Sequence, residues 1–514
     1  MRAAFSAISA RTVTKVCNTL ASALLRPHCR FEFSSKNAPT PQNPSPPSVS
    51  LFSRIQDLSR NEPVGLAFQR WMGEGFPIDR GDIFNTINHL RKRKHHDRAL
   101  EVMEWVMRER PYRLRELEYS YLLEFTVEIH GISEGESLFL RTPSQFQNDL
   151  LYNNLVLACL SKKVIKLPLE YMKKMRELNH QISHLVFNRL IILHSTPGRR
   201  SQIPNLLTQM KADNVPLHVS TFNILMKLHS NDHNIEEVMN IYSNMTKNNI
   251  IPDEISFCIL CTAHVNSRLF SSAESFINPI QNSRVSSTLH ILMILYSQMG
   301  NERELDRVWD LIKRRRLLSR KSFMVAVEAY GRVNVPKSET IWEEMKTKKG
   351  LKSTEEFNSL LSGYCRFGMT RKAIRLFKEM CGKGYKGNAI TCRNLALGCV
   401  RGGHVEQGMR MLRKGEGFTV SKRVKNSARW LECTLGIAVG FAERSDVVNA
   451  EKVFSELEEM KYTRYTFVYN ELIGGYVRGR VYVDGLLRRM ILAGGKPDAE
   501  TYSLVKLVEQ FKTN

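Results

Sequence analysis

The stretch STFNILMKLHSNDHNIEEVMNIYSNMTKNNIIPD at residues 220–253 contains two short helical patterns in succession. Phe222, Leu225 and Leu228 recur at the spacing of one helix face, and a second apolar stripe runs from Ile235 to Tyr242. Each helix has only about a dozen residues and would be marginally stable alone. The stretch therefore predicts a helix hairpin that buries its apolar stripes against neighbouring hairpins.

The same pattern recurs along the chain at a nearly constant interval, as in repeat architectures. An aromatic marker in the first helix advances in equal steps of 35 residues through Tyr152, Phe187, Phe222 and Phe257. A methionine that ends the second helix keeps the same phase at Met175, Met210, Met245 and Met380. We interpret these recurring side chains as core packing. Two markers in one register predict an array of stacked helix hairpins.

Extending this phase gives predicted units that begin near Arg80, Glu116, Asp149, His184, Val219, Glu254, Leu289, Arg320, Thr354, Ala389, Leu431, Thr466 and Ala499. The unit from Ala389 is lengthened to 42 residues in this register. The last unit has one helix, which is expected to cap the stack. The predicted fold is all-α, a right-handed superhelical solenoid of about twelve stacked helix-turn-helix repeats of about 35 residues, with a long concave surface.

The composition limits the partners. Lys plus Arg (75) exceed Asp plus Glu (51), which gives a net charge of +24 and favours a polyanion, with nucleic acid ahead of a membrane surface. Apolar runs are too short to span a bilayer, so no membrane partner is expected. Ten scattered cysteines indicate a reducing compartment rather than a disulfide scaffold.

The N-terminal segment has the composition of an organellar leader. Residues 1–31 contain no Asp or Glu but carry Arg and Lys among apolar and small residues, which predicts a transit peptide at 1–35. A disordered basic tail is the alternative, and a secretory signal fits less well. The predicted organisation then continues with a Pro-rich linker at 36–50, an N-terminal helical segment at 51–79, the repeat array at 80–498 and the capping helix at 499–514.

Two helical repeat families have nearly this period. Tetratricopeptide repeats require Trp, Gly, Ala and Pro at fixed offsets that this chain does not keep. The stretch at 220–253, and EEFNSLLSGYCRFGMTRKAIRLFKEMCGKGYKGN at 355–388, instead resemble the pentatricopeptide repeat. The resemblance covers roughly residues 80–511, and the leader followed by a long array is similar to the plant organellar members of the P class, which consist of repeats alone. It implies binding of single-stranded organellar RNA, one base per repeat, in a mitochondrion or, as the alternative, a chloroplast.

The resemblance also implies which side chains read the bases. In the family, the residue after the aromatic marker and the last residue of the repeat contact one base edge, and amide and carboxylate groups can match its donors and acceptors. The carried-over pairs are Ser120 with Asn148, Asn153 with Ser183, Asn188 with His218, Asn223 with Asp253, Asn358 with Asn388, and Asn470 with Asp498. The family's correspondence assigns uridine to Asn/Asp, a pyrimidine to Asn/Asn and Asn/Ser, and adenosine to Ser/Asn. Cys258/Thr288, Met293/Ser319, Met324/Ser353 and Leu435/Tyr465 depart from the pattern, so a long contiguous code is not expected.

A basic residue also recurs in phase. The row consists of Arg332, Arg366, Arg401 and Arg478, each twelve residues after the start of its unit. One interpretation is a row that tracks RNA phosphates. The alternative is a set of solvated helix ends, where cations favour the C-terminus of the first helix.

The sequence does not predict an enzyme. It carries none of the phosphate-loop, zinc-protease, nucleophile-elbow or zinc-deaminase motifs. Cys258 and Cys261 with His264 have no second ligand pair, so we interpret them as core residues and expect no metal and no cofactor. Transcript stabilisation, processing, splicing or translation is the expected role. A structural component docked on ribosomal RNA or ribosomal proteins, or a protein-binding scaffold of the tetratricopeptide type, remains an alternative, and the oligomeric state is left open.

Overall fold

The computed structural model describes residues 50–513 except residues 60 and 197–198, and every regular element in this part of the chain is a helix. The predicted transit peptide, and the predicted linker up to residue 49, lie outside the described residues. The chain forms two compact units, an N-terminal unit that ends at Thr221 and a C-terminal unit that begins at Phe222. We describe each by itself.

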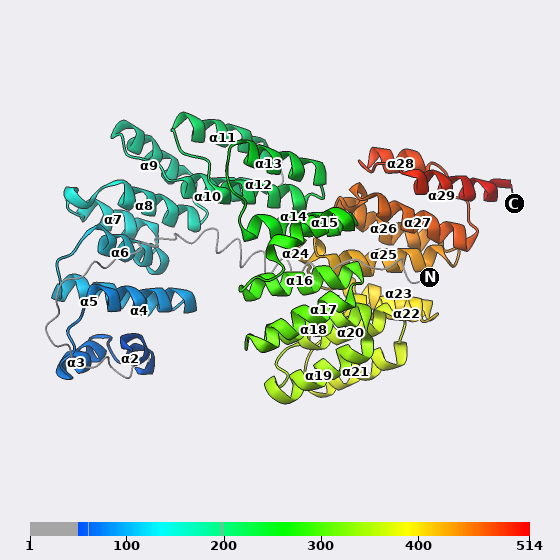
Figure 1. Ribbon diagram of the computed structural model, residues 1–514, viewed down its shortest axis with the longest axis horizontal. Coiled ribbons are helices and arrows are strands. Elements are labelled where there is room, and N and C mark those ends of the chain that lie inside the picture. Colours follow the sequence, from blue (N-terminus) through cyan, green and yellow to red (C-terminus); the bar gives the residue numbers. More distant parts are fainter. Residues whose placement is uncertain (1–49, 60, 197–198, 514) are drawn as a thin grey trace. The chain divides into compact units, whose positions relative to one another are not determined.

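The N-terminal unit holds the predicted N-terminal helical segment and the first repeats (Figure 1). Its helices are α2 (Leu51–Asp57), α3 (Gly65–Gly73), α4 (Arg80–Arg93), α5 (His96–Glu109), α6 (Glu116–Ile129), α7 (Ile132–Arg141), η1 (Ser144–Phe146), α8 (Asp149–Ser161), α9 (Lys166–Glu177), α10 (His184–His194), η2 (Arg200–Gln202) and α11 (Ile203–Ala212). The first helices α6, α8 and α10 pack on one another in succession.

The C-terminal unit continues the alternation of first and second helices, and α12 crosses the boundary between the units. Its helices are α12 (Val219–Asn231), α13 (Ile235–Lys247), α14 (Glu254–Asn266), α15 (Phe270–Ile277), η3 (Asn278–Ile280), α16 (Ser286–Met299), α17 (Glu302–Arg314), α18 (Arg320–Val333), α19 (Val335–Lys349), α20 (Thr354–Arg366), α21 (Thr370–Gly382), α22 (Ala389–Arg401), α23 (Val405–Glu416), α24 (Lys422–Lys425), α25 (Ala428–Ala442), α26 (Val447–Glu459), η4 (Tyr462–Arg464), α27 (Thr466–Gly479), α28 (Leu486–Leu492), α29 (Ala499–Glu509) and η5 (Gln510–Thr513). The first helices α14, α16, α18, α20, α22, α25, α27 and α29 form a continuous layer in which each packs on the next.

Local chemistry sets where these helices begin and end. Asp253 and Asp498 are N-caps whose carboxylates accept a hydrogen bond from the third residue of the following first helix. After three consecutive second helices, Asn179, Asn214 and Asn249 have φ between 53° and 56°. Asparagine tolerates this left-handed conformation better than most residues, so it turns the chain out of the helix. Caps and turns that recur with the repeat fix its phase.

The recurring apolar markers form the core. Tyr152, Phe187 and Phe222 are at most 3% exposed, and Met175 and Met245 are fully buried. The interpretation of these markers as core packing is therefore confirmed. None of the helices in the described part of the chain is long and apolar enough to cross a bilayer.

Two first helices begin earlier than the repeat phase predicts. Helix α16 begins at Ser286 rather than Leu289, and α25 begins at Ala428 rather than Leu431. In α25 the hydroxyl of Ser427 accepts a hydrogen bond from the backbone N of Trp430 at 3.2 Å, and this cap starts the helix three residues early. The register of both units changes accordingly. His290 replaces Met293, and Glu432 replaces Leu435, as the fifth residue of its first helix.

Candidate nucleic-acid interface

A three-residue hydrogen-bond network joins one repeat to the next at Asn223. The amide Nδ2 of Asn223 donates to Asp253 Oδ1 at 2.9 Å, and the Oγ of Ser256 donates to Asn223 Oδ1 at 2.7 Å. Asp253 Oδ1 also accepts from the backbone N of Ser256 at 2.8 Å. One carboxylate therefore caps α14 and at the same time fixes the orientation of the asparagine in the previous repeat.

The same network recurs at two other predicted pairs. Asn358 Nδ2 donates to Asn388 Oδ1 at 3.3 Å, and Thr391 Oγ1 donates to Asn358 Oδ1 at 2.9 Å. In the last repeat, Asn470 donates to Asp498 at 3.1 Å and accepts from Thr501 at 2.7 Å. The structure thus brings the members of these pairs together.

Asp498 is held in its ionised form by this network. Burial by itself would raise the pKa of the carboxyl, but the hydrogen bonds from the backbone and hydroxyl of Thr501 and from Asn470 outweigh burial, and the pKa is lowered. An ionised Asp498 offers acceptors only, which complements a base edge that donates.

The predicted pairs of the N-terminal unit are connected differently. Asn153 Nδ2 donates to the backbone O of Gln181 at 2.8 Å, and its Oδ1 accepts from the backbone N of Ser183 at 2.7 Å. Asn188 reaches His218 through Ser220, with hydrogen bonds of 2.9 and 2.7 Å.

Ser120 and Asn148 each have another partner. Ser120 is hydrogen-bonded to Asn154, and Asn148 caps α8 by accepting from the backbone N of Leu151 at 3.3 Å. The six pairs therefore differ in geometry, from a direct side-chain contact to separate local partners.

A cavity of about 430 Å³ in the N-terminal unit gathers three of the predicted residues, Ser120, Asn153 and Ser183. Tyr121 and Arg91 also line it, and the Arg91 guanidinium lies 4.8 Å from the centre of the Tyr121 ring. Two carboxylates, Glu124 and Asp149, line the cavity as well, and Glu124 is paired with Arg91. The polar groups and the tyrosine are of the kinds that contact an unstacked base, through hydrogen bonds and stacking.

The predicted arginine row does not have a uniform environment. The side chains of Arg332 and Arg366 are 1% and 6% exposed and are paired with carboxylates. Arg401 is partly buried and donates to the backbone O of Arg366. Arg478 is half-exposed, and its Nε donates to Glu443 at 2.7 Å. Of the four, Arg478 has the environment of a solvated helix end.

The candidate metal residues form part of the core. Cys258 and Cys261 are fully buried, and burial raises the pKa of the Cys261 thiol to about 12. The Nδ1 of His264 is hydrogen-bonded to the backbone O of Leu260 at 2.8 Å. Within residues 50–513, apart from the gaps at 60 and 197–198, there is no group of three or more His, Cys, Asp or Glu residues that could hold a metal ion.

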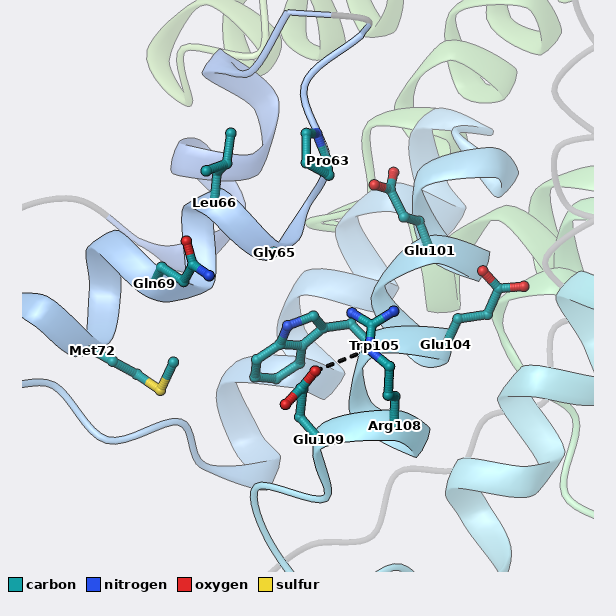
Figure 2. A pocket seen from close by; sticks show the side chains of 10 residues that line it. All are labelled: Pro63, Gly65, Leu66, Gln69, Met72, Glu101, Glu104, Trp105, Arg108 and Glu109. Atoms are coloured by element: carbon teal, nitrogen blue, oxygen red, sulfur yellow. Dashed lines mark hydrogen bonds and ion pairs between the residues drawn. The ribbon is translucent and has the colours of Figure 1, made fainter.

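A further pocket of about 370 Å³ lies between α3 and α5 (Figure 2). Leu66 and Gln69 of α3 face Glu101 and Glu104 of α5 across the indole of Trp105. Carboxylates on this wall repel phosphate, so the pocket does not suit nucleic acid.

The register change reveals two polar residues that the sequence pattern missed. His290 Nε2 is hydrogen-bonded to Ser322 Oγ at 2.9 Å. Ser322 occupies the position in its repeat that the serine or threonine occupies in the asparagine networks. Glu432 accepts a hydrogen bond from the guanidinium of Arg366 at 2.8 Å. The cap at Ser427 is the sequence signal that could have found the register of α25, whereas α16 follows Val285, which forms no side-chain cap.

Stacked two-helix units that share one polar network at the junction of successive repeats define a helical-repeat protein. A family model described as the PPR repeat family matches residues 217–266 and 352–401. The "Pentatricopeptide repeat-containing protein At1g07590, mitochondrial" of Arabidopsis thaliana is 51% identical over 470 residues, covering 91% of this chain and 88% of that protein. The chain therefore belongs to the pentatricopeptide repeat family.

More distant matches extend along the same region. The "Pentatricopeptide repeat-containing protein At1g80270, mitochondrial" of the same plant is 24% identical and covers 83% of this chain and 71% of that protein. The predicted mitochondrial localisation is confirmed by these relatives. A crystal structure of the pentatricopeptide repeat protein PPR10 in complex with an 18-nt psaJ RNA element matches with a TM-score of 0.41 and 16% identity, covering 90% of this chain and 77% of that chain.

Proposed function

We propose that this protein binds single-stranded mitochondrial RNA and acts in the stabilisation, processing, splicing or translation of a transcript, without catalysing a reaction. The observation that carries the proposal is the network that recurs at Asn223, Asn358 and Asn470. In each case the hydroxyl of Ser or Thr donates to the asparagine oxygen and the last residue of the repeat accepts from the asparagine nitrogen, and at Asn470 that nitrogen also donates to Glu500 at 3.3 Å. The three asparagines are themselves buried, so the group that a base edge meets is the more exposed last residue of the repeat, where Asp253 and Asp498 each have a second carboxylate oxygen.

The excess of 24 positive charges supports the same proposal, because a basic protein attracts a phosphate backbone over distances at which specific contacts do not act. The cavity at Ser120, Asn153 and Ser183 adds a site of suitable size for an unstacked base.

Crosslinking in intact mitochondria, followed by sequencing of the bound RNA, tests the proposal. We expect one or a few short single-stranded footprints in a transcript. A variant with Asn223→Ala, Asn358→Ala and Asn470→Ala should lose those footprints, whereas Asn240→Ala, a change on the second helix α13, should keep them. Footprints confined to ribosomal RNA would instead favour the ribosomal component, and the absence of crosslinked RNA would refute RNA binding.

A further inference from the structure

Arginines of the predicted row converge inside the C-terminal unit, where α18, α20 and α22 approach α25. Arg332, Arg366 and Arg401 come from the ends of three successive first helices, and Arg429 comes from the first turn of α25. Two carboxylates, Glu328 and Glu432, lie among these four guanidinium groups. We refer to the six residues as the arginine cluster.

Glu432 is the central acceptor of the arginine cluster. Arg366 donates from Nε to Glu432 Oε1 and from Nη2 to Oε2, both at 2.8 Å, and Arg332 Nη2 donates to Oε2 at 3.3 Å. The forked guanidinium binds carboxylate and phosphate through the same paired geometry. The carboxylate of Glu432 therefore occupies a position that would equally suit two oxygens of a phosphate group.

The two carboxylates leave donors of Arg332 and Arg429 without an acceptor. Glu328 accepts from Arg332 at 3.4 Å and also from Arg429, and the cluster retains an excess of positive charge. The Nε atoms of Arg332 and Arg429 are buried and have no hydrogen-bond partner within the described residues. Buried donors without acceptors are unfavourable, so the cluster is better matched to an anion with more acceptor oxygens.

The position of Glu432 in its repeat is also informative. It is the fifth residue of α25, the position at which Asn223, Asn358 and Asn470 stand in their first helices. At this position the three asparagines form the network that we propose binds RNA, but here the side chain is a carboxylate paired with Arg366 and Arg332, which lie 66 and 100 residues earlier in the chain.

We propose that the arginine cluster is a phosphate-binding site and that Glu432 fills it until an RNA phosphate takes its place. This inference rests on the proposed function, because it assigns a site to the RNA backbone. Glu432 then acts as an internal competitor. The chain binds RNA in the C-terminal unit only when Arg332 and Arg366 exchange one carboxylate for the oxygens of a phosphodiester.

The test compares the full-length protein with Glu432→Gln, which keeps the shape of the side chain and removes its charge. Glu379→Gln is the matched control, because it removes one carboxylate from the second helix α21, where Glu379 pairs with Lys383. Binding of an unstructured 30-nucleotide RNA pool is measured by fluorescence anisotropy between 50 and 300 mM KCl. In parallel, thermal unfolding is recorded with sodium phosphate and with sodium chloride at equal ionic strength.

We expect Glu432→Gln to bind the RNA on the order of tenfold more tightly than the wild type, because the arginines no longer have an internal partner. The slope of log Kd against log salt should increase by about 0.7 for each additional phosphate that the protein neutralises. Inorganic phosphate should raise the melting temperature of Glu432→Gln but not that of the wild type or of Glu379→Gln. A folded Glu432→Gln protein with unchanged or weaker RNA binding and no response to phosphate would overturn the inference.

The RNA-binding measurement and the thermal-unfolding measurement together separate this inference from the proposed function. If phosphate stabilises Glu432→Gln while neither protein binds RNA, the anion site stands and the proposed function fails. If both proteins bind RNA equally and phosphate has no effect, the function stands and the inference fails. Should Glu432→Gln not fold, Glu432→Asp decides, since it keeps the charge but shortens the side chain. A smaller gain in RNA affinity is expected for Glu432→Asp, and no gain would overturn the inference.

Discussion

Asp253 has two roles that one pair of substitutions can separate. It caps α14 through the backbone N of Ser256, and it accepts the amide of Asn223, which is fully buried. Asp253→Ala removes both roles. Loss of an N-cap costs about 1 kcal/mol, and leaving buried donors of Asn223 and Ser256 without their acceptor costs about 1–3 kcal/mol. We therefore expect Asp253→Ala to lower the free energy of unfolding by about 2–4 kcal/mol.

Asp253→Ser keeps the cap but removes the carboxylate. Serine is as good an N-cap as aspartate, so the capping contribution to stability is retained. The remaining loss of unfolding free energy comes from the unsatisfied donors and should lie at the low end of their range of about 1–3 kcal/mol, at about 1 kcal/mol. In contrast, discrimination of uridine from other bases at the corresponding RNA position should fall by about 1–3 kcal/mol, on the scale known for paired side-chain contacts to bases. Both variants should lose this discrimination, although only one of them is strongly destabilised.

Urea unfolding followed by circular dichroism gives the stability of each variant. RNA selected by the wild type, with each of the four bases placed in turn at the corresponding position, gives the discrimination. Asn248→Ser, a change at an exposed turn after α13, serves as the control for both measurements. The reasoning would be refuted if Asp253→Ser discriminated as well as the wild type, or if Asp253→Ala were as stable as Asp253→Ser.

Three further predictions follow from other parts of the chain. Gly363→Ala should destabilise the protein by about 1–3 kcal/mol, because the added Cβ would lie 3.1 Å from the Cα of Gly331 where α18 and α20 meet. Gly382→Ala is the control and should be neutral or stabilising, because its added Cβ would have nothing within 4 Å. Equal urea midpoints for the two variants would contradict this prediction. The pKa of His184 is lowered to about 4 by burial and by the neighbouring His218, so the stability it contributes is present above its unfolded value of about 6.5 and is lost as the pH falls from 6.5 toward 4. His184→Phe should flatten the unfolding free energy in that window, and a curve parallel to the wild type would argue against it. Residues 1–50 fused to a fluorescent reporter should direct it to mitochondria, and a cytosolic reporter would contradict the predicted transit peptide.

The repeat phase could be predicted from the sequence because it depends on contacts within one or two repeats. All but two of the first helices begin at the predicted residues, since caps such as Asp253 and Asp498 and turns such as Asn249 are local signals. The early starts of α16 and α25 were missed because the apolar markers alone set the register there. A cap at Ser427 shifts α25 by three residues, which is nearly one helical turn and preserves the apolar stripe.

The asparagine pairs were predictable for the same reason. Asn470 and Asp498 belong to adjacent first helices, so the geometry of one repeat interface brings their side chains to 3.1 Å. The hydrogen bond from Thr501 was not predicted, but the capping position three residues after Asp498 contains the signal.

The environment of the arginine row depends on distant contacts that no repeat period contains. Arg366 and Arg478 occupy the same position in their repeats, yet Arg366 is buried against Glu432 and Arg478 is half-exposed beside Glu443. The difference arises from the curvature of the stack, which sums a small rotation at every repeat until helices far apart in sequence meet.

The same curvature joins the two ends of the C-terminal unit. Arg268 lies 4.0 Å above the ring of Phe467 and pairs with Glu471, and His233 is hydrogen-bonded to Tyr465 at 2.9 Å. The pairs with Glu471 and Tyr465 link residues 203 and 232 positions apart. Local periodicity therefore determines which side chains line the inner layer, whereas accumulated curvature determines which of them face an opposite wall. A cation at a repeating position can be located from the sequence, but its partner, carboxylate or phosphate, is set by the number and lengths of the repeats between them.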